Sequence, residues 1–278
     1  MRKFIQEKLP YLFIGLTFAW TWSLLGPAAL SKYGIGTATV SNGARTLAGF
    51  TPTIVAIALI AAAKGRQGLL GIWRAIITWR IPLWPTVAAF ALPQLTCLIA
   101  FNLFRILGGA TPALGAWSSS VAFTLVLLPL TAFFEEVGWR YLLLEELQKR
   151  LSPLVATATL ALIWGLWHLP MYFQDNSEGD RTSVLFILFM IGVFPVTAFA
   201  SWFYNRAGGR LLPVMLFHAS LDASIGYYFA KFPTGELRPF GYWVGIMWLC
   251  SLLLFWRFGK TVDHNASQLT SQSRRARA

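Results

Sequence analysis

Three clusters of ionisable residues interrupt otherwise apolar stretches of the sequence, and they are the candidates for chemistry. The chain has only 11 acidic residues and 3 histidines. An ionisable side chain at the centre of a bilayer costs about 2.5–3.5 kcal/mol, so each one needs a structural or functional reason. The residues that carry the clusters are Glu135, Glu136 and Arg140, then Trp164 and His168, then His218 and Asp222.

The first cluster separates two neighbouring carboxylates. On a helix Glu136 and Arg140 are four residues apart and can pair, whereas Glu135 is rotated by about 100° and faces elsewhere. Pairing leaves Glu135 available as a general base that later acts as an acid. The alternative interpretation is a purely structural contact between Glu136 and Arg140.

The other two clusters supply imidazoles. His168 lies one turn after Trp164, and by itself such a histidine can equally be a buried core residue. His218 and Asp222 share one helix face, so Asp222 can orient the imidazole or both can project into one site. A buried polar pair that only fixes helix packing is the alternative. Ser220 points away from both and is not expected to be a nucleophile.

Depth along the helices predicts that these groups converge. The spans that carry Glu135 and His168 form a hairpin, and each residue lies about 22 Å from the turn at 1.5 Å rise per residue. His218 and Asp222 lie about 12 and 18 Å into their own span. A carboxylate with two imidazoles suits water activation and oxyanion stabilisation, which indicates hydrolysis. His264, in the polar tail, is not expected to take part.

The elements that must position these residues are membrane-spanning helices. The 278 residues are 56% hydrophobic and only 12% charged, whereas ordinary soluble domains carry about 25% charged residues. We therefore predict an all-α polytopic membrane protein of about eight transmembrane helices. The expected spans are 11–30, 46–63, 82–104, 119–147, 153–173, 183–204, 211–230 and 240–258.

The basic residues predict the orientation of these spans. The net charge is +12. Most Lys and Arg residues fall in the N-terminal segment and in every second segment that connects the spans after it. That asymmetry predicts that both termini are cytoplasmic. It also disfavours a nucleic-acid partner, because the basic residues are not gathered in one patch.

Segments outside the spans carry further expectations. Residues 64–80 predict an amphipathic helix on the inner leaflet or, equally, a solvated connector. Residues 144–150 are expected to protrude, with Glu145 and Glu146 paired to Lys149 and Arg150 at four-residue spacing. We predict one membrane domain over 1–262, with its catalytic core at about 119–230, and a disordered cytoplasmic tail over 263–278.

The three motifs, in this order, resemble those of the CPBP intramembrane proteases, which include the CAAX prenyl endopeptidases and bacteriocin-processing enzymes. The stretches Glu135–Arg140 and Trp164–Pro170 look most like the bacterial branch. The resemblance implies that Glu135 activates water with help from His168, and that His218 and Asp222 lie on the oxyanion side. It also implies that Glu136 and Arg140 hold the site together, with Trp164 supporting it.

Two residues depart from the family pattern. Trp164 stands where Phe is common, which preserves stacking, and Asp222 stands where eukaryotic members have Asn. An ionised Asp222 would repel an oxyanion, so it must be protonated, orient His218 or bind a metal. The family has been described both as metalloproteases and as glutamate-dependent enzymes. We favour a metal-free site without a cofactor, with Zn²⁺ held by Glu135, His168 and His218 as the alternative.

Two other function classes remain open from the residues. A non-catalytic membrane scaffold or bacteriocin-immunity protein is the main alternative, and a proton-coupled transporter is another. Carriers commonly show repeated halves, and this sequence shows none. We expect a peptide or membrane-protein substrate, contact with the lipid bilayer, and location in the bacterial cytoplasmic (inner) membrane.

Overall fold

The computed structural model describes residues 2–78, 83–127, 133–173, 182–233 and 235–262. Within these ranges the chain is predominantly helical and contains no strand. The all-α prediction is therefore confirmed. The predicted tail, 263–278, lies outside the described residues.

Six helical segments are long and apolar enough to cross a membrane, counted over the described residues. The helices concerned are α1 (Arg2–Ser31), α2 (Asn42–Ile77), α3 (Leu83–Ile106), α7 (Pro153–Trp167) continued by α8 (Leu169–Phe173), α9 (Thr182–Arg206) and α11 (Arg238–Val262). They correspond to six of the expected spans and identify an integral membrane protein. Which side the termini face stays a prediction.

The other two expected spans have a different form. The seventh coincides with α10 (Leu212–Phe229), whose 18 residues include His218 and Asp222. The fourth is described in two parts, because residues 128–132 lie outside the described ranges. The parts are α4 (Trp117–Leu127), and then α5 (Phe133–Glu136), the π-helix η2 (Val137–Leu144) and α6 (Glu145–Gln148).

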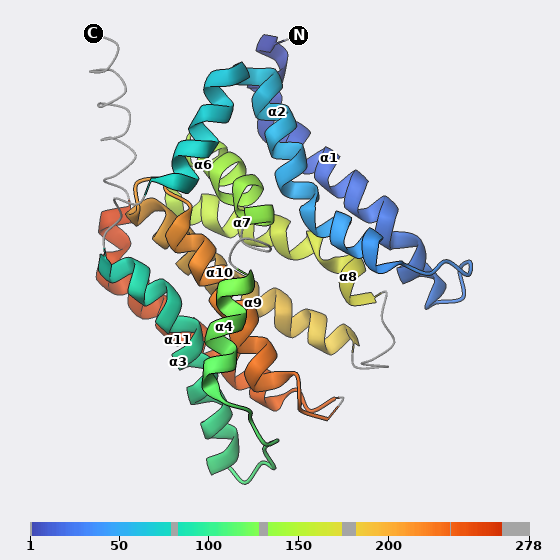
Figure 1. Ribbon diagram of the computed structural model, residues 1–278, viewed down its shortest axis with the longest axis vertical. Helices are drawn as coiled ribbons and strands as arrows, with labels where there is room; N and C mark the ends of the chain where they lie inside the picture. Colours follow the sequence, from blue (N-terminus) through green and yellow to red (C-terminus); the bar gives the residue numbers. More distant parts are fainter. Residues whose placement is uncertain (1, 79–82, 128–132, 174–181, 234, 263–278) are drawn as a thin grey trace.

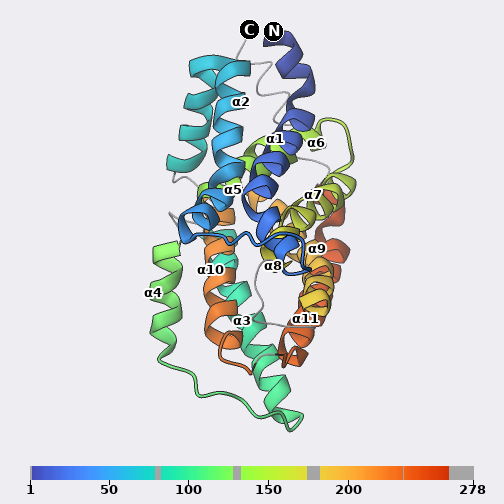
Figure 2. The same cartoon turned by 90° about the vertical axis from the view of Figure 1, so that its right-hand side faces the viewer.

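The helices that carry the candidate site are held by neighbours on several sides. α10 packs against α3 and α4, α7 packs against α9, and η2 packs against α2. Both views show α10 enclosed among other helices, with α4 on the outside of it (Figures 1 and 2). Most of the buried apolar residues of α2, α3, η2, α7, α9 and α10 belong to one continuous core, so the clusters are fixed by tertiary packing.

The amphipathic segment predicted at 64–80 is helical as far as Ile77 and forms the second part of α2, divided from the first part by non-helical backbone at Gly65. Residues 79 and 80 lie outside the described residues. Gly65 bends α2 with φ 59° and ψ −150°, a conformation that favours glycine. Beyond the bend Ile72 and Ala75 are buried, and the backbone N–H of Leu211 donates to the carbonyl of Ala75 at 2.9 Å. One face of this segment therefore packs on protein.

The expectation for residues 144–150 is wrong in its pairing. Glu146 is buried and pairs with Lys149 at three-residue spacing, whereas Glu145 accepts a hydrogen bond from Tyr204 at 2.5 Å. Arg150 instead donates to the backbone carbonyl of Glu7 on α1. Contacts with other helices account for the change, because Tyr204 of α9 bonds to Glu145 and α1 supplies the acceptor for Arg150.

Candidate active site

The π-helix η2 brings the first cluster against α2. Nη1 of Arg140 lies 2.9 Å from Oε1 of Glu136, and both side chains are almost fully buried. The predicted pairing of these two residues is thus present. Gly138 lies between them, and a Cβ there would lie 2.7 Å from the carbonyl oxygen of Pro52. The absence of a side chain at Gly138 allows the two helices to approach this closely.

Arg140 pairs with Glu136 and not with Glu135, as the helical spacing predicts, but Glu135 has partners of its own. Its Oε2 accepts hydrogen bonds from the indole N–H of Trp164 at 2.9 Å and of Trp139 at 3.2 Å. The second donor was missed in the sequence, although Trp139 stands four residues after Glu135. Neither indole carries a charge, so these two hydrogen bonds orient Glu135 without forming an ion pair.

His168 has a defined tautomer when it is neutral. Its Nδ1 lies 2.8 Å from the carbonyl oxygen of Trp164, and only a protonated nitrogen can donate to a carbonyl. Nδ1 therefore carries the proton, which leaves the lone pair on Nε2. The ring is held edge-on between Trp167, with centroids 4.7 Å apart, and Phe189 at 5.0 Å.

His218 connects the first and third clusters. Its Nδ1 lies 2.7 Å from Oε1 of Glu136, and its Nε2 lies 3.7 Å from Oδ2 of Asp222. The Asp222 side chain is 39% exposed, in contrast to 9% for His218. Asp222 is thus the accessible member of the pair and faces the imidazole edge opposite Glu136.

Trp164 is the common neighbour of the three clusters. Besides its bond to Glu135, its ring lies 4.6 Å from the guanidinium carbon of Arg140. Its centroid is 5.4 Å from that of His168 and 5.7 Å from that of His218. The predicted convergence is therefore present, and the position of Trp164 is more central than the stacking role expected from the sequence.

Ser220 belongs to a different polar group. Its hydroxyl donates to the carbonyl of Phe90 on α3 at 2.7 Å and lies 3.4 Å from the amide nitrogen of Gln94. This is consistent with the expectation that it is not the nucleophile. Gln94 also contacts Ser120 and Trp117 on α4, so this group connects α3, α4 and α10, a role that the sequence did not indicate.

The zinc alternative depends on how the candidate ligands are grouped. In the part of the chain that the structure describes, no three His, Cys, Asp or Glu residues are grouped so that they could hold a metal ion. Nδ1 of His168 and Nδ1 of His218 are engaged with a carbonyl and a carboxylate, which leaves Nε2 of each ring as the nitrogen that could bind a metal. The metal-free site and the zinc set of Glu135, His168 and His218 both stay predictions.

These features define an all-helical membrane protein with a buried site of carboxylates and imidazoles. Residues 117–224, which contain all three clusters, match the family model described as "Type II CAAX prenyl endopeptidase Rce1-like". The chain is also similar to the "CAAX prenyl protease 2" of Methanococcus maripaludis, with 28% identity over 177 residues. That alignment spans 60% of this chain and 65% of the relative. The resemblance to the CPBP proteases is confirmed, whereas assignment to their bacterial branch stays a prediction.

Proposed function

We propose that the protein is an intramembrane endopeptidase in which Glu135 and His168 activate a water molecule for attack on a peptide bond. The observation that carries the proposal is the double role of Trp164. Its indole N–H holds Glu135, and its carbonyl fixes the tautomer of His168. One residue thus orients both a carboxylate and a basic imidazole nitrogen, the two groups that a general-base mechanism needs.

The roles of the other residues follow from their contacts. In this mechanism Glu135 takes the proton of the attacking water and later delivers it to the leaving amine. His218, whose Nδ1–H is held by the Glu136 carboxylate, acts as the imidazolium, and its Nε2–H donates to the carbonyl oxygen as negative charge develops there. Glu136 and Arg140 position His218 rather than react. Asp222 either orients His218 or is protonated, because an ionised carboxylate beside the oxyanion would repel its negative charge.

The substrate class follows from the comparison and the setting. The matched relative is named a CAAX prenyl protease, and by that similarity we propose a peptide or a membrane-protein segment cleaved at the membrane. An inner-membrane location and a metal-free reaction are part of the same proposal. The main alternative is a non-catalytic scaffold or immunity protein.

The test is cleavage of a fluorogenic peptide library by the purified protein in detergent. Wild type is compared with Glu135→Gln and with Glu7→Gln, which changes an exposed carboxylate on α1. Each is assayed with and without a strong chelator. Activity that is lost only in Glu135→Gln supports the proposal. Loss of wild-type activity in chelator would contradict the metal-free mechanism, and activity retained in Glu135→Gln would contradict the role of that residue. No cleavage by wild type would favour the scaffold.

A further inference from the structure

A groove of about 660 Å³ lies between α7, α9 and α11, apart from the candidate active site. Its volume falls within the range of about 300–1,000 Å³ that is typical of ligand sites. Its lining residues, all from described segments, include none of the predicted site residues. The groove is therefore separate from the candidate active site.

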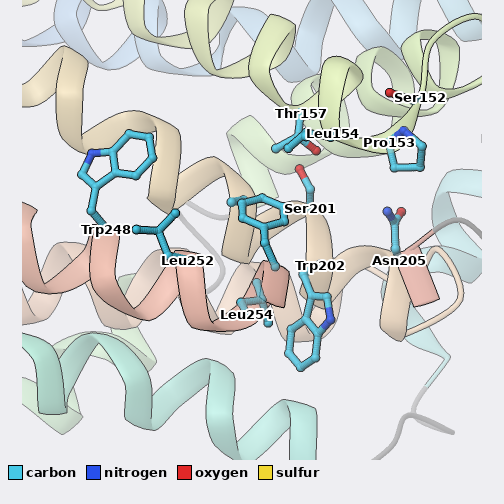
Figure 3. Close-up of a pocket in the computed structure, with 12 residues that line it drawn as sticks. Ser152, Pro153, Leu154, Thr157, Ser201, Trp202, Asn205, Trp248, Leu252 and Leu254 are labelled. Carbon is cyan, nitrogen blue, oxygen red and sulfur yellow. The ribbon is translucent and has the colours of Figure 1, made fainter. Parts of the chain in front are cut away.

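The groove is polar at one end and apolar at the other. Ser152 and Asn205 line one end, and Trp248 lies toward the opposite end with Leu252 beside it (Figure 3). Ser152 directly precedes α7, and Asn205 is the second-last residue of α9. The polar end thus lies at the ends of membrane-spanning helices, where lipid headgroups are found, and the apolar end extends toward the hydrocarbon core.

A buried hydroxyl in the middle of the groove lacks a partner. Ser201 lines the groove and is only 3% exposed. Its Oγ has no hydrogen-bond partner among the residues that the structure describes. Figure 3 shows Ser201 facing Thr157 of α7 across the groove. An unsatisfied buried hydroxyl is costly, so Ser201 favours a ligand that carries a hydrogen-bond acceptor. Ser201 lies one helical turn from Asn205 on α9, which places that acceptor about 6 Å further along the groove.

One exposed basic residue adjoins the polar end in the sequence. Arg206 directly follows the lining residue Asn205 on α9. The N-terminus of α7, whose dipole favours anions, begins at the same end with Pro153. No Asp or Glu is among the lining residues of the described chain. The charge therefore matches an anionic group.

We propose that this groove binds a phospholipid with an anionic headgroup from the surrounding membrane. The phosphate lies beside Asn205 and Arg206, an ester carbonyl accepts a hydrogen bond from Ser201, and one acyl chain lies along Leu252 and Trp248. The order of phosphate, ester and acyl chain matches the order of charge, hydroxyl and apolar surface along the groove. This inference does not depend on the proposed catalytic role.

The test is native mass spectrometry of the protein released from nanodiscs that contain equal amounts of phosphatidylglycerol and phosphatidylcholine. Wild type is expected to retain one phosphatidylglycerol in preference to phosphatidylcholine. Leu252→Trp places a large ring in the groove and should abolish the preference. Leu253→Trp is the matched control, because Leu253 is adjacent, similarly exposed at 62% against 56%, and does not line the groove.

A second pair of variants tests the charge. Arg206→Gln should lower the preference about fivefold, the contribution of one basic residue near an anionic lipid surface. Arg105→Gln, which removes an exposed charge from the last turn of α3, should leave it unchanged. Equal retention of the two lipids by wild type would overturn the proposal. So would a preference that survives Leu252→Trp, or one that Leu253→Trp abolishes equally.

Discussion

The carboxylate of Glu136 lies 2.7 Å from Nδ1 of His218, and this contact joins two clusters that are 82 residues apart in the sequence. The same oxygen also accepts from Arg140 at 2.9 Å. Glu136 is therefore shared between a fixed cation and an imidazole, whereas Glu135, its neighbour, contacts only indoles among the described hydrogen bonds. The two carboxylates have different surroundings, and they should respond differently to substitution.

Glu136→Gln should destabilise the protein, because it leaves Arg140 and His218 without their common anion in a buried site. Breaking such a contact costs about 3–5 kcal/mol. Glu135→Gln should be nearly neutral for stability, since a single amide oxygen can replace Oε2 as the acceptor of both indole hydrogen bonds. Thermal unfolding in detergent measures the two effects. A stability loss of the same size in both variants would contradict the assigned division of roles.

Trp164→Phe should lower the rate of peptide cleavage about tenfold or more. The substitution keeps a ring beside Arg140 but removes the N–H bond to Glu135, and a hydrogen bond to a charged group contributes about 1.5–3 kcal/mol. The backbone carbonyl that holds His168 stays in place. Steady-state kinetics should therefore show a fall in kcat with little change in KM.

Trp73→Phe is the control for that substitution, since Trp73 is exposed on α2. It should have wild-type kinetics. Equal activity of Trp164→Phe and Trp73→Phe would show that the indole N–H of Trp164 does not orient the carboxylate.

Gly138→Ala should prevent η2 from seating against α2. The added methyl group would lie 2.7 Å from a backbone carbonyl oxygen of Pro52, and backbone cannot move aside as a side chain can. Overpacking of this kind costs about 1–3 kcal/mol and would displace Glu136 and Arg140. Unfolding temperature and cleavage activity should both fall. Gly245→Ala on α11 is the control, because nothing lies within 4 Å of the added Cβ, and it should change neither quantity. An unchanged unfolding temperature and activity in Gly138→Ala would contradict the close approach of η2 to α2.

Gln94→Leu should loosen the packing of α4 on α10. Its amide contacts Ser120 and Trp117 of α4 and Ser220 of α10, and such hydrogen bonds between membrane helices contribute about 0.6–1.7 kcal/mol. A modest fall in unfolding temperature is expected. Asn102→Leu, on the same helix, removes a bond only to its own helix at Leu98 and should have less effect. An equal fall in unfolding temperature in Gln94→Leu and Asn102→Leu would show that Gln94 does not hold α4 against α10.

The sequence was informative where periodicity and spacing decide the outcome. Apolar run length predicted the helices, and four-residue spacing predicted the contacts of Glu136 with Arg140 and of His218 with Asp222. Spacing within one helix cannot predict contacts between helices, so the link from Glu136 to His218 was not foreseen. The π-helix was not foreseen either, because no residue type specifies it. Glu145 and Glu146 have other partners than predicted, because Tyr204 on another helix bonds to Glu145 and Lys149 pairs with Glu146.

Thr39→Cys and Gln67→Cys test the orientation of the membrane domain. Both residues are exposed, Thr39 between α1 and α2 and Gln67 just after the bend in α2. A helix of membrane-spanning length separates them, so they should lie on opposite sides. In a background that lacks Cys97 and Cys250, a membrane-impermeant maleimide added to intact cells should label Thr39→Cys alone. After permeabilisation both should react. Labelling of Gln67→Cys alone in intact cells would place the N-terminus outside and reverse the orientation that the basic residues predict.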